Sequence, residues 1–423
     1  MNAPTGDDSV AVVVDGHSTG SFLVDEFAAR GLEVIHVQTG EYGAPALVHD
    51  LRYKKQLALA GGIRNVVEEL EHWPVHCVVP GLEGEGVTIA EDLASALDLP
   101  GNRTGSASAR RDKARMADAL RAAGVRHIPH AVADDARPLV AQWSSWGKPT
   151  VMLKPPASAG SEDVIPCSSA EEIMRASQEI LGKINACELP NESVLMQPLV
   201  TGEEYVVNAV SANGNHCVTD IWFCRKVPSP SGTPLDVYSD LIDSTSPLAN
   251  LLTEYVFRVL DATDISWGAS HSEIILSDSG PVLVEVGARL MGGSFDFNQL
   301  IRTGAYSQLE TLVDAYVDPE QFDRKASRSY QRTHSVRTVD FQPTQSGVIS
   351  GIRLDNIRSW DSYLMDYLAV GKGDVLAAPF DRNSHVGYVT LAHRDRDVVS
   401  RDYERLRQLE PTIFEVEREH LSS

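Results

Sequence analysis

The sequence predicts a chain that combines α/β and α+β architecture. Its first residues follow a strand, loop, helix and strand pattern, which is typical of a parallel α/β layer. Residues 268–293 have the pattern of a long antiparallel hairpin. Beyond about residue 330, short alternating strands and one helix predict an additional α+β lobe. With 423 residues the chain exceeds what one hydrophobic core usually holds, so we expect roughly two to four domains.

Composition narrows the class of partner. The net charge of −22 opposes binding to nucleic acid or to an anionic membrane, so we expect small-molecule partners and local cations for any phosphate ligand. No apolar run approaches the roughly 18 residues of a membrane span, and the start lacks the basic and apolar regions of a signal peptide. We therefore expect a cytoplasmic protein. The five cysteines are scattered, which favours buried free thiols.

Two acidic residues mark a candidate ligand edge in the amino-terminal layer. The turn at 17–20 lacks the G-x-G-x-x-G spacing, so we expect it to serve the fold or a domain interface rather than a dinucleotide. The strand 76–81 leads into a glycine-rich loop that carries Glu83 and Glu85. This is the carboxyl edge of the predicted sheet, where α/β proteins bind ligands. One of the two carboxylates could hold a substrate ammonium group; solvated loop residues are the alternative.

A lysine and a loop of small residues predict a phosphate site. A basic helix over residues 106–125 carries Lys113, which by itself would be a solvated side chain. The strand TVMLK then ends at Lys154, and the loop 155–161 that follows consists of proline and small residues. Small side chains let backbone N–H groups approach an anion, and a lysine supplies a point charge. The Walker spacing is absent. We interpret the segment as a phosphate loop, with a plain turn between strands as the alternative.

A strand, a connector and another strand follow. The connector from Gln197 to Val200 could meet a purine edge with its backbone groups, and Glu204 could reach ribose hydroxyls. Residues 225–247 are rich in proline, serine and glycine and predict a long mobile loop. At its start, Arg225 and Lys226 could join a phosphate cage or could be solvated at the surface.

The predicted hairpin brings two acidic residues together. Its strands, 269–276 and 281–288, flank a turn, and alternation of side chains places Glu273 nearly opposite Glu285. Like charges opposed across a sheet cost roughly 0.2 to 1 kcal/mol, so a positive group should lie between them. Two carboxylates with Arg289 four residues further on fit a site for a divalent metal and a polyphosphate. The alternative is a solvated acidic hairpin.

These segments, taken in order, resemble the ATP-grasp superfamily from the first residues to about residue 330. The tract H-S-E-I-I-L with E-V-G-A-R-L-M-G-G and the extra carboxyl-terminal lobe resemble the L-amino acid ligases, the ATP-dependent dipeptide synthetases. The motifs that carry the resemblance are Lys113, V-M-L-K-P-P-A-S-A-G-S with Lys154, Gln197-Pro198, Gly202-Glu203-Glu204-Tyr205, Glu273, Glu285 and Arg289.

The resemblance implies an ATP-grasp fold in which ATP lies between two antiparallel sheets. It also implies a division of the chain into five parts. These are an N-terminal parallel α/β (pre-ATP-grasp) domain at 1–105, a linking helical segment at 106–147, a lid at 148–210, a core with the metal site at 211–330 and the α+β lobe at 331–423.

The resemblance assigns a role to residues in each of these parts. The nucleotide residues are Lys113, Lys154, Ser158, Gly160 and Ser161 at the phosphates, Gln197, Leu199 and Val200 around adenine, and Glu204 at the ribose. The remaining residues are Glu273 and Glu285 as ligands of Mg²⁺, with Mn²⁺ as the alternative metal, Arg289 at the phosphoryl intermediate, and His271, Met291 and Gly293 with Glu83 around the substrate.

Three positions depart from the family pattern. Gly287 occupies the place of an asparagine that many ATP-grasp enzymes have after the second metal carboxylate. Asp163 stands where a glycine is common in the phosphate loop. Gly293 stands where a bulky residue narrows the first-substrate pocket in some amino acid ligases, so we expect a roomier pocket and a larger first substrate.

The activity that the resemblance implies is the joining of an amino acid or related carboxylate to an amine or second amino acid. Because oxide is a poor leaving group, ATP would first convert the carboxylate to an acyl phosphate, and the amine would then displace phosphate. Arg289 and Lys154 would stabilise charge in these steps. The alternatives are a biotin-carboxylase-like carboxylation, a purine-pathway ligation and a non-catalytic nucleotide-binding protein. A homodimer is expected by analogy alone.

Overall fold

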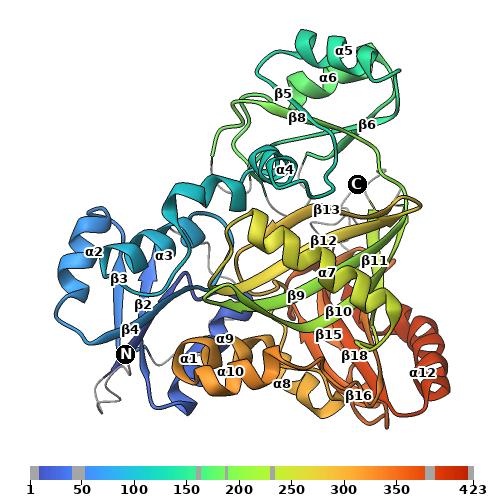
Figure 1. Cartoon of the computed structure of the whole chain (residues 1–423). Helices are drawn as coiled ribbons and strands as arrows, with labels where there is room; N and C mark the ends of the chain where they lie inside the picture. The colour runs from blue at the N-terminus through green and yellow to red at the C-terminus, as the bar shows by residue number, and fades with distance from the viewer. Residues whose placement is uncertain are drawn as a thin grey trace.

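A computed structural model describes residues 9–40, 53–158, 163–185, 189–228, 234–376 and 386–417. The described strands form four sheets, and the mixed α/β and α+β class is confirmed (Figure 1). Within the described ranges, no helix has the length and apolar character needed to cross a membrane. Cys77, Cys167 and Cys217 are buried free thiols and Cys224 is half-buried, while Cys187 lies outside the described residues.

The amino-terminal layer is a parallel sheet with the strand order β3-β2-β1-β4, as the opening pattern predicts. Every side chain of β1 is buried, because helices cover the sheet. Its strands are β1 (Val10–Val14), β2 (Glu33–Gln38), β3 (Lys55–Ala58) and β4 (Val75–Pro80), and its helices are α1 (Leu23–Ala29), α2 (Ile63–Leu70) and α3 (Glu85–Ala96).

The lid is a four-stranded antiparallel sheet that stands apart at the top of Figure 1. Its own core packs Leu139 and Trp143 against Ile173 and Leu153. The strands are β5 (Ala131–Ala133), β6 (Val151–Lys154), β7 (Ile165–Cys167) and β8 (Val194–Pro198), and the helices are α5 (Ala136–Ser145) and α6 (Ala170–Ile180). β5, which falls within the predicted linking segment, pairs with β8 of the lid sheet, and helix α4 (Lys113–Ala122) precedes it in the chain.

An eight-stranded sheet forms the body of the molecule, in the order β13-β12-β9-β10-β11-β14-β18-β16. Helix α7 packs on one face, and α9 and α10 pack on the other. The core strands are β9 (Glu203–Ala212), β10 (Asn215–Pro228), β11 (Pro234–Leu241), β12 (Gly268–Ser277) and β13 (Gly280–Gly287). The core helices are α7 (Pro247–Ala262), α8 (Phe297–Leu300), α9 (Gln308–Val317) and α10 (Pro319–Ala326).

The prediction of a long mobile loop at 225–247 is wrong for residues 225–228 and 234–241. Residues 225–228 are the last residues of β10 and residues 234–241 are the whole of β11, and the two strands pair with each other. Lys226 lies opposite Asp236 in this ladder, so cross-strand pairing outweighs a composition that is typical of loops. The two prolines stand at strand ends, where a missing N–H is tolerated.

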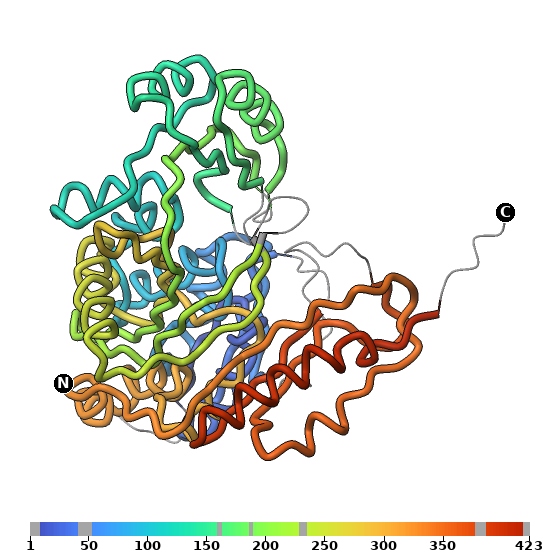
Figure 2. The backbone as a smooth tube through the Cα atoms, turned by 90° about the vertical axis from the view of Figure 1, so that its right-hand side faces the viewer, coloured from blue at the N-terminus to red at the C-terminus, as the bar shows by residue number. Residues whose placement is uncertain are grey.

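The carboxyl-terminal elements follow the prediction, but three of their strands extend the central sheet through the pairing of β11 with β14. The remaining three form a small sheet. Figure 2 shows this segment, orange to red, on the far side of the core from the lid. The elements are β14 (Ser335–Asp340), β15 (Gly347–Ile352), α11 (Asp355–Arg358), β16 (Tyr363–Leu368), β17 (Val375–Leu376), β18 (Gly387–His393), α12 (Arg396–Leu409) and β19 (Phe414–Glu417). Short 3-10 helices cover Ser18–Phe22, Thr104–Arg110, Ile301–Thr303 and Glu410–Thr412. The predicted domain boundaries stay a prediction.

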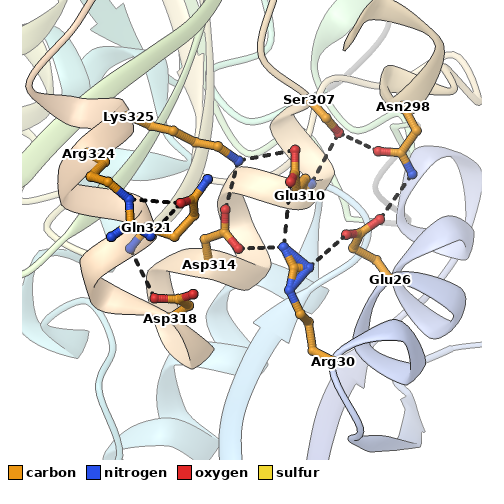
Figure 3. Close-up of polar contacts among 10 residues, drawn as sticks. All are labelled: Glu26, Arg30, Asn298, Ser307, Glu310, Asp314, Asp318, Gln321, Arg324 and Lys325. Atoms are coloured by element: carbon orange, nitrogen blue, oxygen red, sulfur yellow. Dashed lines mark hydrogen bonds and ion pairs between the residues drawn. The ribbon is translucent and has the colours of Figure 1, made fainter.

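An ion network joins the amino-terminal layer to the core (Figure 3). Arg30, just after α1, lies 2.6 Å from Asp314 of α9. Lys325 of α10 lies 2.7 Å from the same aspartate and 3.1 Å from Glu310. The Asp314 side chain is fully buried, so its charge depends on these two cations. The network therefore fixes how the first layer sits against α9 and α10.

Candidate active site

The hairpin of β12 and β13 places Glu273 directly opposite Glu285, which confirms the predicted pairing. The expected positive group is Lys113, whose Nζ lies 2.6 Å from Glu285 Oε2. Lys113 is the first residue of α4, and Asp112 caps that helix by accepting from the backbone N–H groups of Ala114 and Arg115. The cap fixes where α4 begins and therefore where Lys113 lies. The lysine thus reaches the hairpin from a separate segment of the chain.

Two lysines converge beside these carboxylates. Lys113 donates to the carbonyl oxygen of Ser158 at 2.9 Å, which ties it to the lid loop. Burial disfavours its charge, but Glu285 and two more distant glutamates hold the pKa of Lys113 above its usual value. Burial, followed by the charge of Lys113, lowers the pKa of Lys154 to about 8. An anion between the two lysines would relieve their repulsion.

Glu83 and Arg289 form a second pair across the site. Arg289 Nε donates to Glu83 Oε2 at 3.0 Å, and a second guanidinium nitrogen donates to the same oxygen. Burial works against both charges, yet each partner stabilises the other, so the pKa of Glu83 falls and that of Arg289 rises. The structure thus brings Glu83 to the site, whereas Glu85 begins α3 and is exposed.

Glycine at position 287 makes this pair possible. A Cβ at that position would lie 3.3 Å from Glu83 Oε1 and 3.4 Å from Arg289 Nε. The first distance is slightly shorter than an ordinary van der Waals contact and the second is at its lower limit, so a side chain at position 287 would shift the Glu83 carboxylate by a few tenths of an ångström. Asp163 has φ of 50°, the left-handed conformation that explains why glycine is common there and that aspartate tolerates.

Hydrogen bonds hold His271 in one orientation. Its Nδ1 lies 2.9 Å from the amide oxygen of Asn208, while the Asn208 amide nitrogen donates to Asp220 at 2.6 Å. An amide oxygen can only accept, so His271 Nδ1 carries a proton and Nε2, 3.7 Å from Glu273, faces the site. Sequence reasoning missed Asn208 and Asp220, although a polar residue inside an apolar strand was a usable signal.

A cavity of about 450 Å³ lies between the hairpin and strands β9, β10, β14 and β18. It contains eight of the predicted site residues: Glu83, Glu204, His271, Glu273, Glu285, Arg289, Met291 and Gly293. It also contains residues that the sequence did not indicate: Trp222, Cys224, Asp236, Phe295, Thr338 and Tyr388. Two of these, Thr338 and Tyr388, come from the carboxyl-terminal strands, so that lobe contributes to the site.

The wall at Gly292 and Gly293 carries no side chain. No heavy atom lies within 4 Å of a Cβ built at either residue, so the expected space is open. Gly293 also has φ of 86°, a conformation that a bulky residue adopts only with strain. The backbone conformation at position 293 therefore favours glycine, and the missing side chain also enlarges the pocket.

Of the predicted nucleotide residues that the structure describes, Glu204 lines this cavity, and Lys113 adjoins it through its contact with Glu285. Gln197 is buried at the end of β8, Leu199 is exposed and Val200 is half-buried. Glu204 forms an ion pair with Lys226, which also lies 3.8 Å from Asp236. Gly160 and Ser161 lie outside the described residues. Among the residues that are described, no three histidine, cysteine, aspartate or glutamate side chains are grouped to hold a metal ion.

A lid sheet over an antiparallel core, with lysines facing paired carboxylates and an arginine, defines an ATP-grasp enzyme. Residues 147–296 match the family model of the ATP-grasp domain. Dapdiamide A synthase of Enterobacter agglomerans is 30% identical over 334 residues, which cover 76% of this chain and 76% of that protein. The chain belongs to the ATP-grasp superfamily and, within it, to the amino acid ligase family predicted from the motifs.

Solved structures share the fold over almost the whole chain. L-amino acid ligase from Bacillus licheniformis matches with a TM-score of 0.76 at 15% identity, covering 97% of this chain and 99% of that chain. N5-carboxyaminoimidazole synthetase from Staphylococcus aureus, complexed with ADP, matches with a TM-score of 0.67 at 11% identity, covering 97% and 99%. Such identities show the fold alone. The family membership shown by the dapdiamide synthase relative identifies an ATP-dependent carboxylate-amine ligase that forms C–N bonds, and the carboxylase and purine-ligase alternatives are not favoured.

Proposed function

We propose that this ligase converts the carboxylate of an amino acid, or of a related acid, into an acyl phosphate and transfers the acyl group to an amine, releasing ADP and phosphate. The observation that carries the proposal is that Lys113, Lys154, Glu273, Glu285 and Arg289 come together from separate segments of the chain. The lysines suit phosphate oxygens, and the arginine suits a carboxylate or acyl phosphate. Positioned charges of this kind lower the barrier to phosphoryl transfer.

The carboxylates of Glu273 and Glu285 fit a magnesium ion. They lie opposite each other in the hairpin, and carboxylate oxygens are the ligands that Mg²⁺ prefers. Two carboxylates do not fill an octahedral shell, which agrees with the usual arrangement in which substrate phosphates supply further oxygens. A bound Mg²⁺, or Mn²⁺ as the alternative, would neutralise charge on the triphosphate. Lys113 would then exchange Glu285 for a phosphate oxygen.

The pair of Glu83 and Arg289 suits an amino acid zwitterion. Each member already holds the other, so neither charge lacks a partner before substrate binds. A zwitterion inserted between them would give its carboxylate to Arg289 and its ammonium group to Glu83, replacing one pair by two. His271 Nε2 would accept a hydrogen bond from bound substrate, while Met291 and Gly293 border the side chain. Glu83 would thus select substrates that carry a positive group near the carboxylate.

The nucleotide would lie between lid and core. Ser158, Gly160 and Ser161 would approach the phosphates, and Gln197, Leu199 and Val200 would surround adenine. Glu204 would face the ribose hydroxyls, and its ion pair with Lys226 holds the carboxylate in position. We also propose a cytoplasmic location, where ATP is available, and a homodimer by analogy with the family.

The test is incubation of the protein with MgATP and pooled amino acids, with ADP and AMP measured separately and products identified by mass spectrometry. We expect ADP, phosphate and a condensed product whose mass equals that of two substrates minus water. AMP with pyrophosphate would contradict the acyl-phosphate route. ADP formation that required bicarbonate instead of amino acids would favour a carboxylase.

A further inference from the structure

A second cavity, of about 550 Å³, lies behind the wall of the first. Its lining combines Ser21 and Phe22 of the amino-terminal layer with Met365 and Tyr367 of β16. Tyr388 of β18 lines both cavities. The two spaces are therefore neighbours that share a side chain.

The partition between the cavities is a single stretch of backbone, 293–296. Gly293 and Phe295 line the first cavity, and Ser294 and Asp296 line the second. At Gly293 the first cavity meets backbone and open space instead of a side chain. Among the described residues, the two linings share only Tyr388, so this stretch and that tyrosine separate the spaces.

Hydrogen bonds hold the partition in place. The Ser294 N–H donates to Ser18 Oγ at 3.0 Å, and the Phe295 N–H donates to Thr19 Oγ1 at 3.0 Å. The Tyr388 hydroxyl donates to the Ser294 carbonyl oxygen at 3.3 Å. The last bond is long, and a ligand that passed the partition on its β18 side would also displace the Tyr388 ring from its contacts with Phe295 and Tyr367.

Aromatic rings continue from one cavity to the other. Trp222 and Phe295 have ring centroids 5.8 Å apart, Phe295 and Tyr388 5.7 Å, and Tyr388 and Tyr367 5.6 Å. The first two rings line the first cavity and Tyr367 lines the second. A chain of apolar ring faces and edges thus runs past the partition, and such a surface favours an apolar ligand segment.

The charged side chains of the second cavity already have polar partners. Arg358 donates two hydrogen bonds of 2.8 Å to Asp366. Asp296 caps α8 by accepting from the Asn298 N–H at 3.1 Å, and it accepts from the Gln299 side chain at 3.1 Å. A charged ligand would have to displace one of these partners, so the lining favours an uncharged one.

We propose that the second cavity binds the distal end of the side chain of the carboxylate substrate, and that this side chain is extended, uncharged and partly apolar. The inference rests on the proposed function, and it adds the class of substrate. Arg289, Gly293 and Phe295 line the same cavity, so a substrate whose carboxylate is held by Arg289 can extend its side chain along the partition. The end of an extended side chain then reaches Tyr388 and the space beyond it.

The test compares alanine with a series of glutamine derivatives whose side-chain amide carries alkyl or benzyl groups of increasing length. Initial rates of ADP release give kcat/KM for each. Gln299→Trp fills the second cavity, because Gln299 lines it, and Ile301→Trp adds the same side chain at an exposed position that does not line it. A buried methylene is worth about 0.8 kcal/mol, or roughly fourfold in affinity.

We expect kcat/KM of the unmodified protein to rise about tenfold or more along the series. Gln299→Trp should remove that rise and leave alanine within about twofold, while Ile301→Trp should behave as the unmodified protein. Equal kcat/KM for short and long side chains, or an equal loss for all substrates in Gln299→Trp, would overturn the proposed binding in the second cavity but not the proposed ligase activity. Absence of ADP with every substrate would overturn both.

Discussion

Lys113 and Glu285 meet at 2.6 Å although α4 and β13 are far apart in the chain. The contact neutralises the centre of the site before any ligand binds. In the reaction that we propose, the two ions separate, the lysine toward phosphate and the glutamate toward a cation. Each ion thus exchanges one partner for another and is never left unpaired. This keeps the free-energy cost of burying the two charges low.

Loss of either acidic or basic charge at this centre should stop ADP formation. We expect Glu285→Gln and Arg289→Ala to lower kcat by about 10² to 10³, because each removes a charge that faces the transferred phosphoryl group. Circular dichroism and a melting curve would check that the fold persists. Glu254→Gln, at an exposed position on α7, is the matched control for Glu285→Gln. Normal turnover in Glu285→Gln would contradict the assignment.

Local pattern was enough to predict the hairpin, because a turn between two alternating strands fixes the register of Glu273 against Glu285. It was not enough for Lys113, because the contact depends on how α4 docks. The place of Tyr388 in the site could not be predicted for a similar reason. Its strand joins the site because β11 pairs with β14, and no sequence motif indicates that pairing. At residues 225–247 we interpreted the proline, serine and glycine content as a loop, and this interpretation was wrong for the residues that pair in β10 and β11.

A side chain at position 287 should weaken amino acid binding more than ATP binding. Gly287→Ala places a Cβ 3.3 Å from Glu83 Oε1, so the pair with Arg289 shifts by a few tenths of an ångström. We expect KM for the amino acid to rise roughly tenfold, below the 10² that a misplacement of about 1 Å can cause. KM for ATP should stay within about twofold. Steady-state kinetics with each substrate varied in turn would show a parallel rise if the whole site were distorted.

The network of Arg30, Asp314 and Lys325 should control stability and not chemistry. Asp314→Asn leaves Lys325, which is itself buried, without its nearest carboxylate, and we expect the free energy of unfolding to fall by about 3 kcal/mol. Asp323→Asn, at an exposed site on α10, should change it by less than about 0.5 kcal/mol. Urea unfolding followed by circular dichroism measures both. A double variant, Asp314→Leu with Lys325→Met, should recover part of the loss, since it removes the charge that Asp314→Asn leaves buried.

Lys154 should make ATP binding weaken in alkaline solution. Burial and the neighbouring charge of Lys113 lower the pKa of its amine to about 8 in the free protein, and phosphate oxygens would favour the charged form and raise the pKa in the complex. Below pH 8 the amine is already protonated, so the Kd for ATP should be flat. Above pH 8 binding requires uptake of a proton, so Kd should rise by up to about tenfold per pH unit until the pKa of the complex is reached. Titration calorimetry at saturating Mg²⁺ in buffers of different ionisation enthalpy would detect that proton. Lys154→Arg keeps its charge throughout this range, and its Kd should not show the rise. The same slope in both proteins would assign it to another group.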